Sequence, residues 1–190
     1  MVDTYPAMHQ DNAKPLPTNT GKKQPLWQAL AKQAPSLAGK RVLAIHAGDG
    51  WFCRYAINHG AIAVLGVDND AQAISDARAV ASNDRLRYRI MPDSALPLLS
   101  GPYDLIVGTF DLARDDLHQI STQLSGLLRH HGQLLAAVTT PLTADYPQRG
   151  LQLKAVFDEH LTIDSLYQVA DKRLQTREQI HFVFSSRSGR

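Results

Sequence analysis

Hydrophobic residues along the chain change their spacing at regular intervals, which predicts strands and helices in alternation. Short continuous apolar runs such as 103–108 are typical of strands buried in a parallel sheet, whereas leucine and isoleucine at helical spacing in 115–128 indicate a helix facing a core. The predicted strands are 41–45, 63–68, 85–91, 103–108 and 133–139, and the predicted helices are 26–31, 52–59, 70–82 and 115–128. Such elements bury both faces of a sheet when the strands are parallel and helices cover each side. The pattern predicts an α/β, Rossmann-like doubly wound fold.

The end of the chain follows a different pattern. A predicted helix around 151–160 precedes two strand-like stretches, 163–169 and 179–185, with no helix-length segment between them. A parallel pair would need a long crossover connection, so these two strands are expected to form an antiparallel hairpin. His130 and His131, just before a glycine, are expected to cap the end of the helix at 115–128.

The first 24 residues show no apolar periodicity and carry prolines among polar residues. We expect residues 1–24 to form a flexible arm or lid, and residues 25–190 to form a single domain. A length of 190 residues with 44% hydrophobic residues is enough for one domain with its own core.

Composition narrows the class of protein. A formal charge of +2 does not indicate a protein that binds nucleic acid. Arg85, Arg87 and Arg89 alternate along one predicted strand, and we interpret them as a face exposed to solvent. No run approaches the roughly 18 apolar residues of a transmembrane helix, and the N-terminus lacks the pattern of a secretory signal. We therefore expect a cytoplasmic protein without membrane contact, a monomer or a homodimer. The single cysteine, Cys53, is expected in the core.

The segment Val42–Gly50 is the most informative motif, because an apolar strand enters a glycine-bearing turn and then a helix. Glycines let a ligand approach the backbone, and free N–H groups at the helix start favour a nucleotide-like cofactor. Asp68 closes the next apolar strand, where a carboxylate can accept hydrogen bonds from ribose hydroxyls. Dinucleotides and S-adenosylmethionine both suit this arrangement. Cys53, where a dinucleotide fold needs a third small residue, disfavours a pyrophosphate, and the terminal hairpin points the same way.

At this point the chain resembles the class I S-adenosylmethionine-dependent methyltransferases, particularly the small-molecule branch, whose first motif reads like Val-Leu-Asp-Leu-Gly-Cys-Gly-x-Gly. The likeness covers roughly residues 26–186, and the first hundred residues carry most of it. It implies a seven-stranded sheet of order 3-2-1-4-5-7-6 with strand seven antiparallel. It also implies a cofactor across the carboxyl ends of strands 1, 2 and 4, with S-adenosylhomocysteine as the product.

The resemblance assigns roles by position. Gly48 and Gly50 would border the methionine part of the cofactor, Asp68 with Asn69 would bind the ribose, and Asp93 would face the adenine amino group. Thr109 would line the methyl-donor side, while 139–141 would lie near the substrate. The residues expected to bind the cofactor are His46, Ala47, Gly48, Asp49, Gly50, Asp68, Asn69, Asp93, Ser94 and Thr109. No metal site is expected, since no histidine or cysteine spacing suggests one.

Two departures from the family motif leave alternatives open. Ala44 stands where the family usually has an acid that holds the amino group of the methionine tail, and His46 replaces the first glycine. Asp49 could replace that acid or simply begin the helix, and Asp68 could be a helix N-cap. The histidine that the family often has after strand four is also missing, so no catalytic residue is assigned. The leading hypothesis is methyl transfer to a small-molecule acceptor. The alternative is a degenerate relative that serves as a binding or scaffolding module, and a nicotinamide-dependent oxidoreductase is a weaker third.

Overall fold

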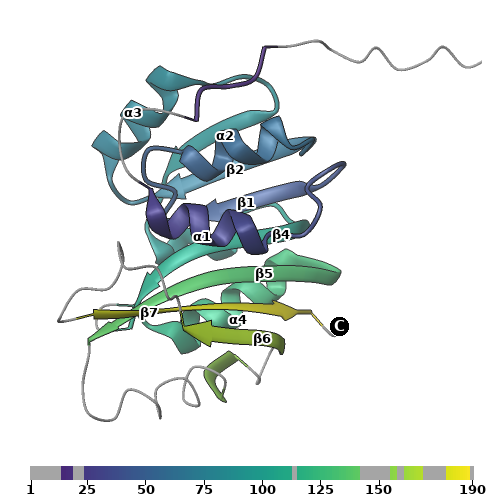
Figure 1. The fold of residues 1–190 in the computed structure, drawn as a ribbon, viewed down its shortest axis with the longest axis vertical. Coiled ribbons are helices and arrows are strands. Elements are labelled where there is room, and N and C mark those ends of the chain that lie inside the picture. The colour runs from purple at the N-terminus through teal and green to yellow at the C-terminus, as the bar shows by residue number, and fades with distance from the viewer. Residues whose placement is uncertain are drawn as a thin grey trace, which may run out of the picture.

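Seven strands form one sheet in the part of the chain that the computed structural model describes, residues 14–18, 24–112, 115–141, 155–157, 161–168 and 179–188 (Figure 1). Across the sheet the strands lie in the order β3-β2-β1-β4-β5-β7-β6. Their bounds are β1 Arg41–Ile45, β2 Ala63–Asp68, β3 Leu86–Ile90, β4 Tyr103–Asp111, β5 Leu128–Pro141, β6 Thr162–Gln168 and β7 Gln179–Arg187. The first five strands are parallel, and β7 is antiparallel to both of its neighbours. The predicted α/β, Rossmann-like fold with a mostly parallel sheet is confirmed.

Helices cover both faces of the sheet. Their bounds are α1 Pro25–Gln33, α2 Trp51–Asn58, α3 Ala71–Val80, the 3-10 helix η1 Asp93–Leu98 and α4 Leu117–Leu127. Alternate residues of β1 point to opposite faces, so Val42 and Ala44 pack with α1, α2 and α3, while Leu43 and Ile45 pack with η1 and α4. In Figure 1, α1 accordingly lies in front of the sheet and α4 behind it. All four side chains are fully buried, which is why these strands read as continuous apolar runs.

Strand β5 is longer than the sequence predicts. It begins at Leu128, which pairs with Tyr103 of β4, and it ends at Pro141, which pairs with β7. Helix α4 therefore ends at Leu127, and His130 and His131 lie within β5. The predicted helix-capping role of the two histidines is wrong, because the chain enters the next strand before it reaches them.

The predicted hairpin at the end of the chain is confirmed, since β6 and β7 pair antiparallel. Of the predicted helix at 151–160, the structure describes only residues 155–157, which are helical, and the remainder lies outside the described residues. Within the described ranges, no helix has both the length and the apolar character needed to cross a membrane.

The described part of the N-terminal segment, residues 14–18, packs on α2. The Leu16 backbone N–H donates to Asn58 Oδ1 at 2.7 Å, and Asn58 Nδ2 donates back to the Leu16 carbonyl oxygen at 2.8 Å. The Leu16 side chain packs against the apolar cluster of this face. These residues of the expected arm are therefore anchored, whereas residues 1–13 and 19–23 lie outside the described part.

Candidate functional site

A pocket of about 450 Å³ lies beyond the carboxyl ends of the parallel strands. Parallel strands end at the same edge of the sheet, so the residues that follow β1, β2 and β3 meet those at the ends of β4 and β5. The lining consists of Leu26, His46, Asp68, Asn69, Asp70, Asp93, Thr109, Phe110, Asp111, Asp115 and Thr139. Five of the ten residues predicted to bind a cofactor, namely His46, Asp68, Asn69, Asp93 and Thr109, are thus brought together in one place.

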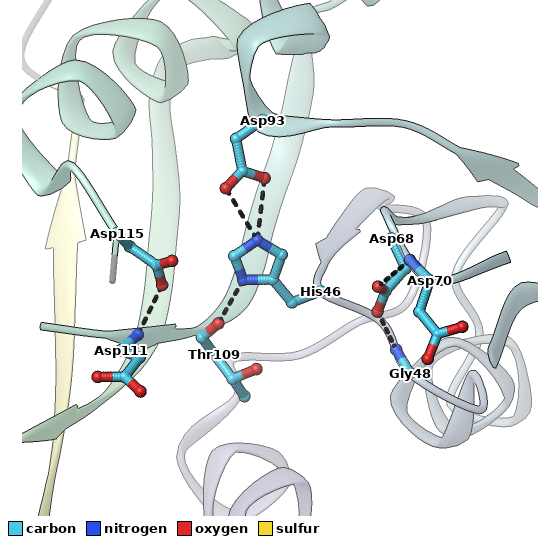
Figure 2. A network of polar contacts seen from close by, with 8 residues as sticks. All are labelled: His46, Gly48, Asp68, Asp70, Asp93, Thr109, Asp111 and Asp115. Atoms are coloured by element: carbon cyan, nitrogen blue, oxygen red, sulfur yellow. Dashed lines mark hydrogen bonds and ion pairs between the residues drawn. The ribbon is translucent and has the colours of Figure 1, made fainter. Parts of the chain in front are cut away.

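Asp68 fixes the glycine turn to the end of β2. Its Oδ2 accepts a hydrogen bond from the Gly48 backbone N–H at 2.8 Å, and its Oδ1 accepts one from the Asp70 backbone N–H at 2.9 Å (Figure 2). Each carboxylate oxygen can accept a second hydrogen bond, so the carboxylate can still receive ligand hydroxyls. The N-cap of α3 is Asp70, whose side chain accepts from two backbone N–H groups of the first turn. Asp68 therefore does not cap that helix.

His46 extends its side chain into this pocket and is held at both ring nitrogens. Nδ1 lies 2.6 Å from the carbonyl oxygen of Thr109, and Nε2 lies 2.9 Å and 3.1 Å from the two carboxylate oxygens of Asp93 (Figure 2). The Phe110 ring packs edge-on against the imidazole, with 5.5 Å between ring centroids. Since a carbonyl oxygen and a carboxylate both accept hydrogen bonds, both nitrogens of His46 donate.

This double donation makes His46 a cation. Burial lowers its pKa, but the hydrogen bonds to Asp93 and Thr109 and the charges of Asp93 and Asp115 together raise it to about 9 from the ordinary value of 6.5. The imidazolium and the Asp93 carboxylate form an ion pair across the pocket. His46 and Asp93 were predicted on separate grounds, and their contact with each other was not anticipated.

Acidic side chains dominate the rest of the lining. Besides Asp68, Asp70 and Asp93, the pocket contains Asp111 and Asp115, and Asp115 Oδ2 accepts a hydrogen bond from the Asp111 backbone N–H at 2.6 Å. Among the lining residues that the structure describes, only His46 brings a positive charge. This described lining favours a ligand that carries positive charge.

The other five predicted residues, Ala47, Gly48, Asp49, Gly50 and Ser94, do not line the pocket. Gly50 has a φ of 74°, and a Cβ added there would overlap the Tyr88 phenol, so this position requires glycine for packing. Asp49 is buried at the start of α2, where its Oδ1 accepts from the Trp51 backbone N–H at 3.1 Å. Asp49 thus lies in the turn before α2, two residues ahead of the first helical residue. Ser94 is exposed.

Ala44 lies on the other face of β1 from the residues that pack with η1 and α4. It is fully buried among apolar residues of α1 and α2. The place where the family usually has an acid is therefore part of the apolar core of this chain.

Arg54 of α2 is a structural residue that the sequence did not single out. It is fully buried, and its Nε donates to the Pro17 carbonyl oxygen at 2.6 Å while its Nη1 donates to the carbonyl oxygen of Asp49. It also lies 3.9 Å from the Asp49 carboxylate. Arg54 thus joins the glycine turn to the N-terminal segment. An arginine inside an otherwise apolar helix was the available signal.

The sequence also missed Leu26, Asp70, Asp111 and Asp115 as pocket residues. The run of aspartates between β4 and α4 was a signal for the last two, because it follows the carboxyl end of a central strand. Among the described residues, no cluster of three histidine, cysteine, aspartate or glutamate side chains could hold a metal ion.

Comparison with known proteins identifies relatives of this fold. Residues 42–132 match the family described as "Methyltransferase domain". A search of curated proteins finds no match to the sequence.

Three solved structures illustrate the likeness. An S-adenosylmethionine-dependent methyltransferase from Mesorhizobium loti has a TM-score of 0.66 at 20% identity, covering 85% of this chain and 96% of that one. The N-methyltransferase NodS from Bradyrhizobium japonicum WM9, whose structure with S-adenosyl-L-homocysteine is also known, has a TM-score of 0.65 at 15% identity over 87% and 95% of the chains. The [4+2]-cyclase SpnF has a TM-score of 0.69 at 13% identity over 86% and 80%. At these identities the likeness concerns the fold.

Proposed function

The chain belongs, through residues 42–132, to the class I S-adenosylmethionine-dependent methyltransferases, and from this premise we propose that it transfers the methyl group of S-adenosylmethionine to a small-molecule acceptor. The observation that carries the proposal is the convergence of Asp68, Asp93 and Thr109 on one pocket beyond the carboxyl ends of the strands. The family places its cofactor at that end of the sheet.

The ribose end of the cofactor fits the residues present. The Asp68 carboxylate is oriented by the Gly48 and Asp70 N–H groups and retains acceptor capacity for two hydroxyls. Gly48, with a φ of 55°, has open space where a side chain would be, so a ligand could approach the backbone there. Asn69, in the same lining, would stand beside the ribose.

The charge of the pocket suits the reactive end. When bound, S-adenosylmethionine supplies an electrophilic methyl group on a positively charged sulfur. The aspartates of the lining favour that cation over its neutral thioether product, which assists release after transfer. The contribution of the protein is then to align donor and acceptor and to exclude water.

A concave site of this volume supports a small acceptor. Asp111, Asp115 and Thr139, at the ends of β4 and β5, would line the acceptor side.

A second candidate function, a binding or scaffolding module without turnover, is favoured by His46. Its imidazolium ties up the Asp93 carboxylate that would face the adenine, and it projects into the same pocket from a position where the family has glycine. A bound cofactor must therefore displace this side chain or use it as part of the pocket wall.

Calorimetric titration with S-adenosylhomocysteine and S-adenosylmethionine tests whether the pocket binds the cofactor that methyl transfer requires. We expect the wild-type chain to bind both ligands, S-adenosylmethionine more tightly, and Asp68→Asn to weaken binding at least tenfold. Asp84→Asn, an exposed site outside the pocket, is the matched control and should change affinity less than twofold.

The variant His46→Gly tests whether the imidazole blocks the cofactor or forms part of its binding site. A large gain in affinity means that the imidazole blocks the cofactor, while unchanged tight binding means that the site works as it stands. If neither the wild type nor His46→Gly binds either ligand at millimolar concentration, the methyltransferase proposal is wrong and the binding module remains.

A further inference from the structure

A second concave region lies at the opposite end of the sheet, where the parallel strands begin. It has a volume of about 340 Å³, and four arginines line it: Arg41 at the start of β1, Arg85 just before β3, and Arg87 and Arg89 within β3. Tyr103, the first residue of β4, and Asp84 complete its polar lining together with a serine. We call this region the arginine groove.

Arg87 and Arg89 share one face of the sheet because they alternate along β3, and Arg85 precedes them at the same spacing. Leu86 and Tyr88, the residues between them, are buried on the face of α2 and α3. No residue of β3 belongs to the apolar cluster on the other face, so that face of the edge strand is open to solvent and carries Arg87 and Arg89. The groove is thus an uncovered part of the sheet walled by guanidinium groups.

The positive charge of the groove is not neutralised by neighbouring acids. Within the described residues, the side chains of Arg85, Arg87 and Arg89 make no hydrogen bond or ion pair. Asp104, beside Arg41 in the sheet, is occupied by Arg129 Nη1 at 2.8 Å and by the backbone N–H of Arg41 at 2.8 Å. Of the described residues that line the groove, only Asp84 contributes a negative charge.

One guanidinium group of the groove packs on a phenol. The Cζ atom of Arg41 lies 5.6 Å from the ring centroid of Tyr103, a distance at which a cation is attracted to an aromatic ring. Burial raises the pKa of Tyr103, while the positive charges of Arg41 and Arg89 lower it.

We propose that the arginine groove binds a small anion that carries a chain of two or three phosphates, either an inorganic polyphosphate or a nucleoside polyphosphate. Guanidinium groups form paired hydrogen bonds with phosphate oxygens, and an anion with several charges relieves the mutual repulsion of the four arginines. The concave shape favours a small molecule. A nucleic acid would need a wider basic surface than a chain of net charge +2 offers.

Calorimetric titration of the full chain with inorganic tripolyphosphate, with ATP and with adenosine tests this site. We expect both phosphorylated probes to bind and adenosine not to bind at the groove. The double variant Arg87→Gln/Arg89→Gln should weaken tripolyphosphate binding at least tenfold. The control Lys14→Gln/Lys32→Gln, which removes two exposed charges elsewhere, should change it less than twofold. The variant Arg87→Lys/Arg89→Lys keeps the positive charges but loses the paired N–H donors of the guanidinium groups. Its affinity for tripolyphosphate should lie between those of the glutamine variant and the lysine control.

The source of the phosphate chain follows from the two probes. Equal affinity for tripolyphosphate and ATP identifies the polyphosphate alone as the ligand, whereas tighter ATP binding means that the nucleoside contributes. Asp68→Asn, in the pocket at the other end of the strands, should leave the affinity for tripolyphosphate unchanged. The test of the arginine groove is therefore independent of the test of methyl transfer.

Three results would overturn the proposal. They are no binding of tripolyphosphate to the wild type, equal weakening in the groove variant and the lysine control, and tighter binding of a single-stranded 20-mer oligonucleotide than of either phosphate probe. The last result would indicate a nucleic-acid surface. Thermal unfolding of each variant checks that it is folded, and substitutions at these exposed arginines should leave the melting temperature nearly unchanged.

Discussion

A left-handed backbone conformation at position 46 would normally call for glycine, yet the chain places a histidine there with a φ of 53°. Such a conformation costs about 1–2 kcal/mol for a residue with a side chain. The ion pair with Asp93 and the hydrogen bond to Thr109 offset that cost.

The stability of the protein should therefore depend on the protonation of His46. Its pKa is raised in the folded chain, so its contribution is complete below the unfolded value of 6.5 and is lost as the pH rises through about 9. Urea unfolding at several pH values should show the wild type losing stability over this range relative to His46→Gln, which cannot titrate. Asp93→Asn should lower the pKa of His46, as followed by NMR of the imidazole. A constant difference between the wild type and His46→Gln would contradict this assignment.

At the scale of elements, helix α2 is the anchor of the site. Its first turn follows Gly50, Arg54 in its middle binds the Asp49 and Pro17 carbonyl oxygens, and Asn58 at its end holds Leu16. One helix thus fastens both the glycine turn and the N-terminal segment.

Two substitutions in α2 should separate these functions. Arg54→Met loses both carbonyl contacts and leaves Asp49 buried without its cation, which should cost about 3 kcal/mol in the free energy of unfolding. Asn58→Ala removes only the two hydrogen bonds to Leu16, at a cost of about 1–2 kcal/mol. Both variants should expose residues 14–18 to a protease of broad specificity, as read by mass spectrometry. Resistance of this segment in both variants would mean that apolar packing alone holds it.

The elements differ in how far the sequence predicts them. Buried parallel strands such as β1, β2 and β4 could be located within a few residues, because two-sided burial leaves an unbroken apolar run. The first residues of β5 were missed, since Arg129, His130 and His131 carry no apolar pattern and lie at an irregularity between the pairings of Leu128 and Gln133 with β4.

The same limit holds for the site. Asp68, Asp93 and Thr109 could be predicted, because their place at strand ends follows from the fold class. The ion pair of His46 with Asp93 joins residues 47 positions apart and depends on the direction of one side chain, which no local pattern encodes.

At the scale of the whole molecule, the two concave regions lie at opposite ends of the same parallel strands. The carboxyl ends carry a pocket with five aspartates and one histidine, and the amino ends carry a groove with four arginines and one aspartate. The net charge of +2 conceals this separation. Ligands of opposite charge are therefore directed to opposite ends of the sheet.

This polarity has a consequence for solutions that contain only this protein. The basic end of one copy complements the acidic end of the next, and such a head-to-tail contact does not close on itself, so short open chains of molecules should form. The attraction reaches about 30 Å at 0.01 M salt and about 8 Å at 0.15 M. Dynamic light scattering should show a larger mean radius at low salt, which shrinks on addition of salt and is absent in Arg87→Gln/Arg89→Gln. A radius independent of salt would contradict the expectation. The protein thus carries an electric dipole along its strands, and the ionic strength of the solution sets how strongly one molecule attracts the next.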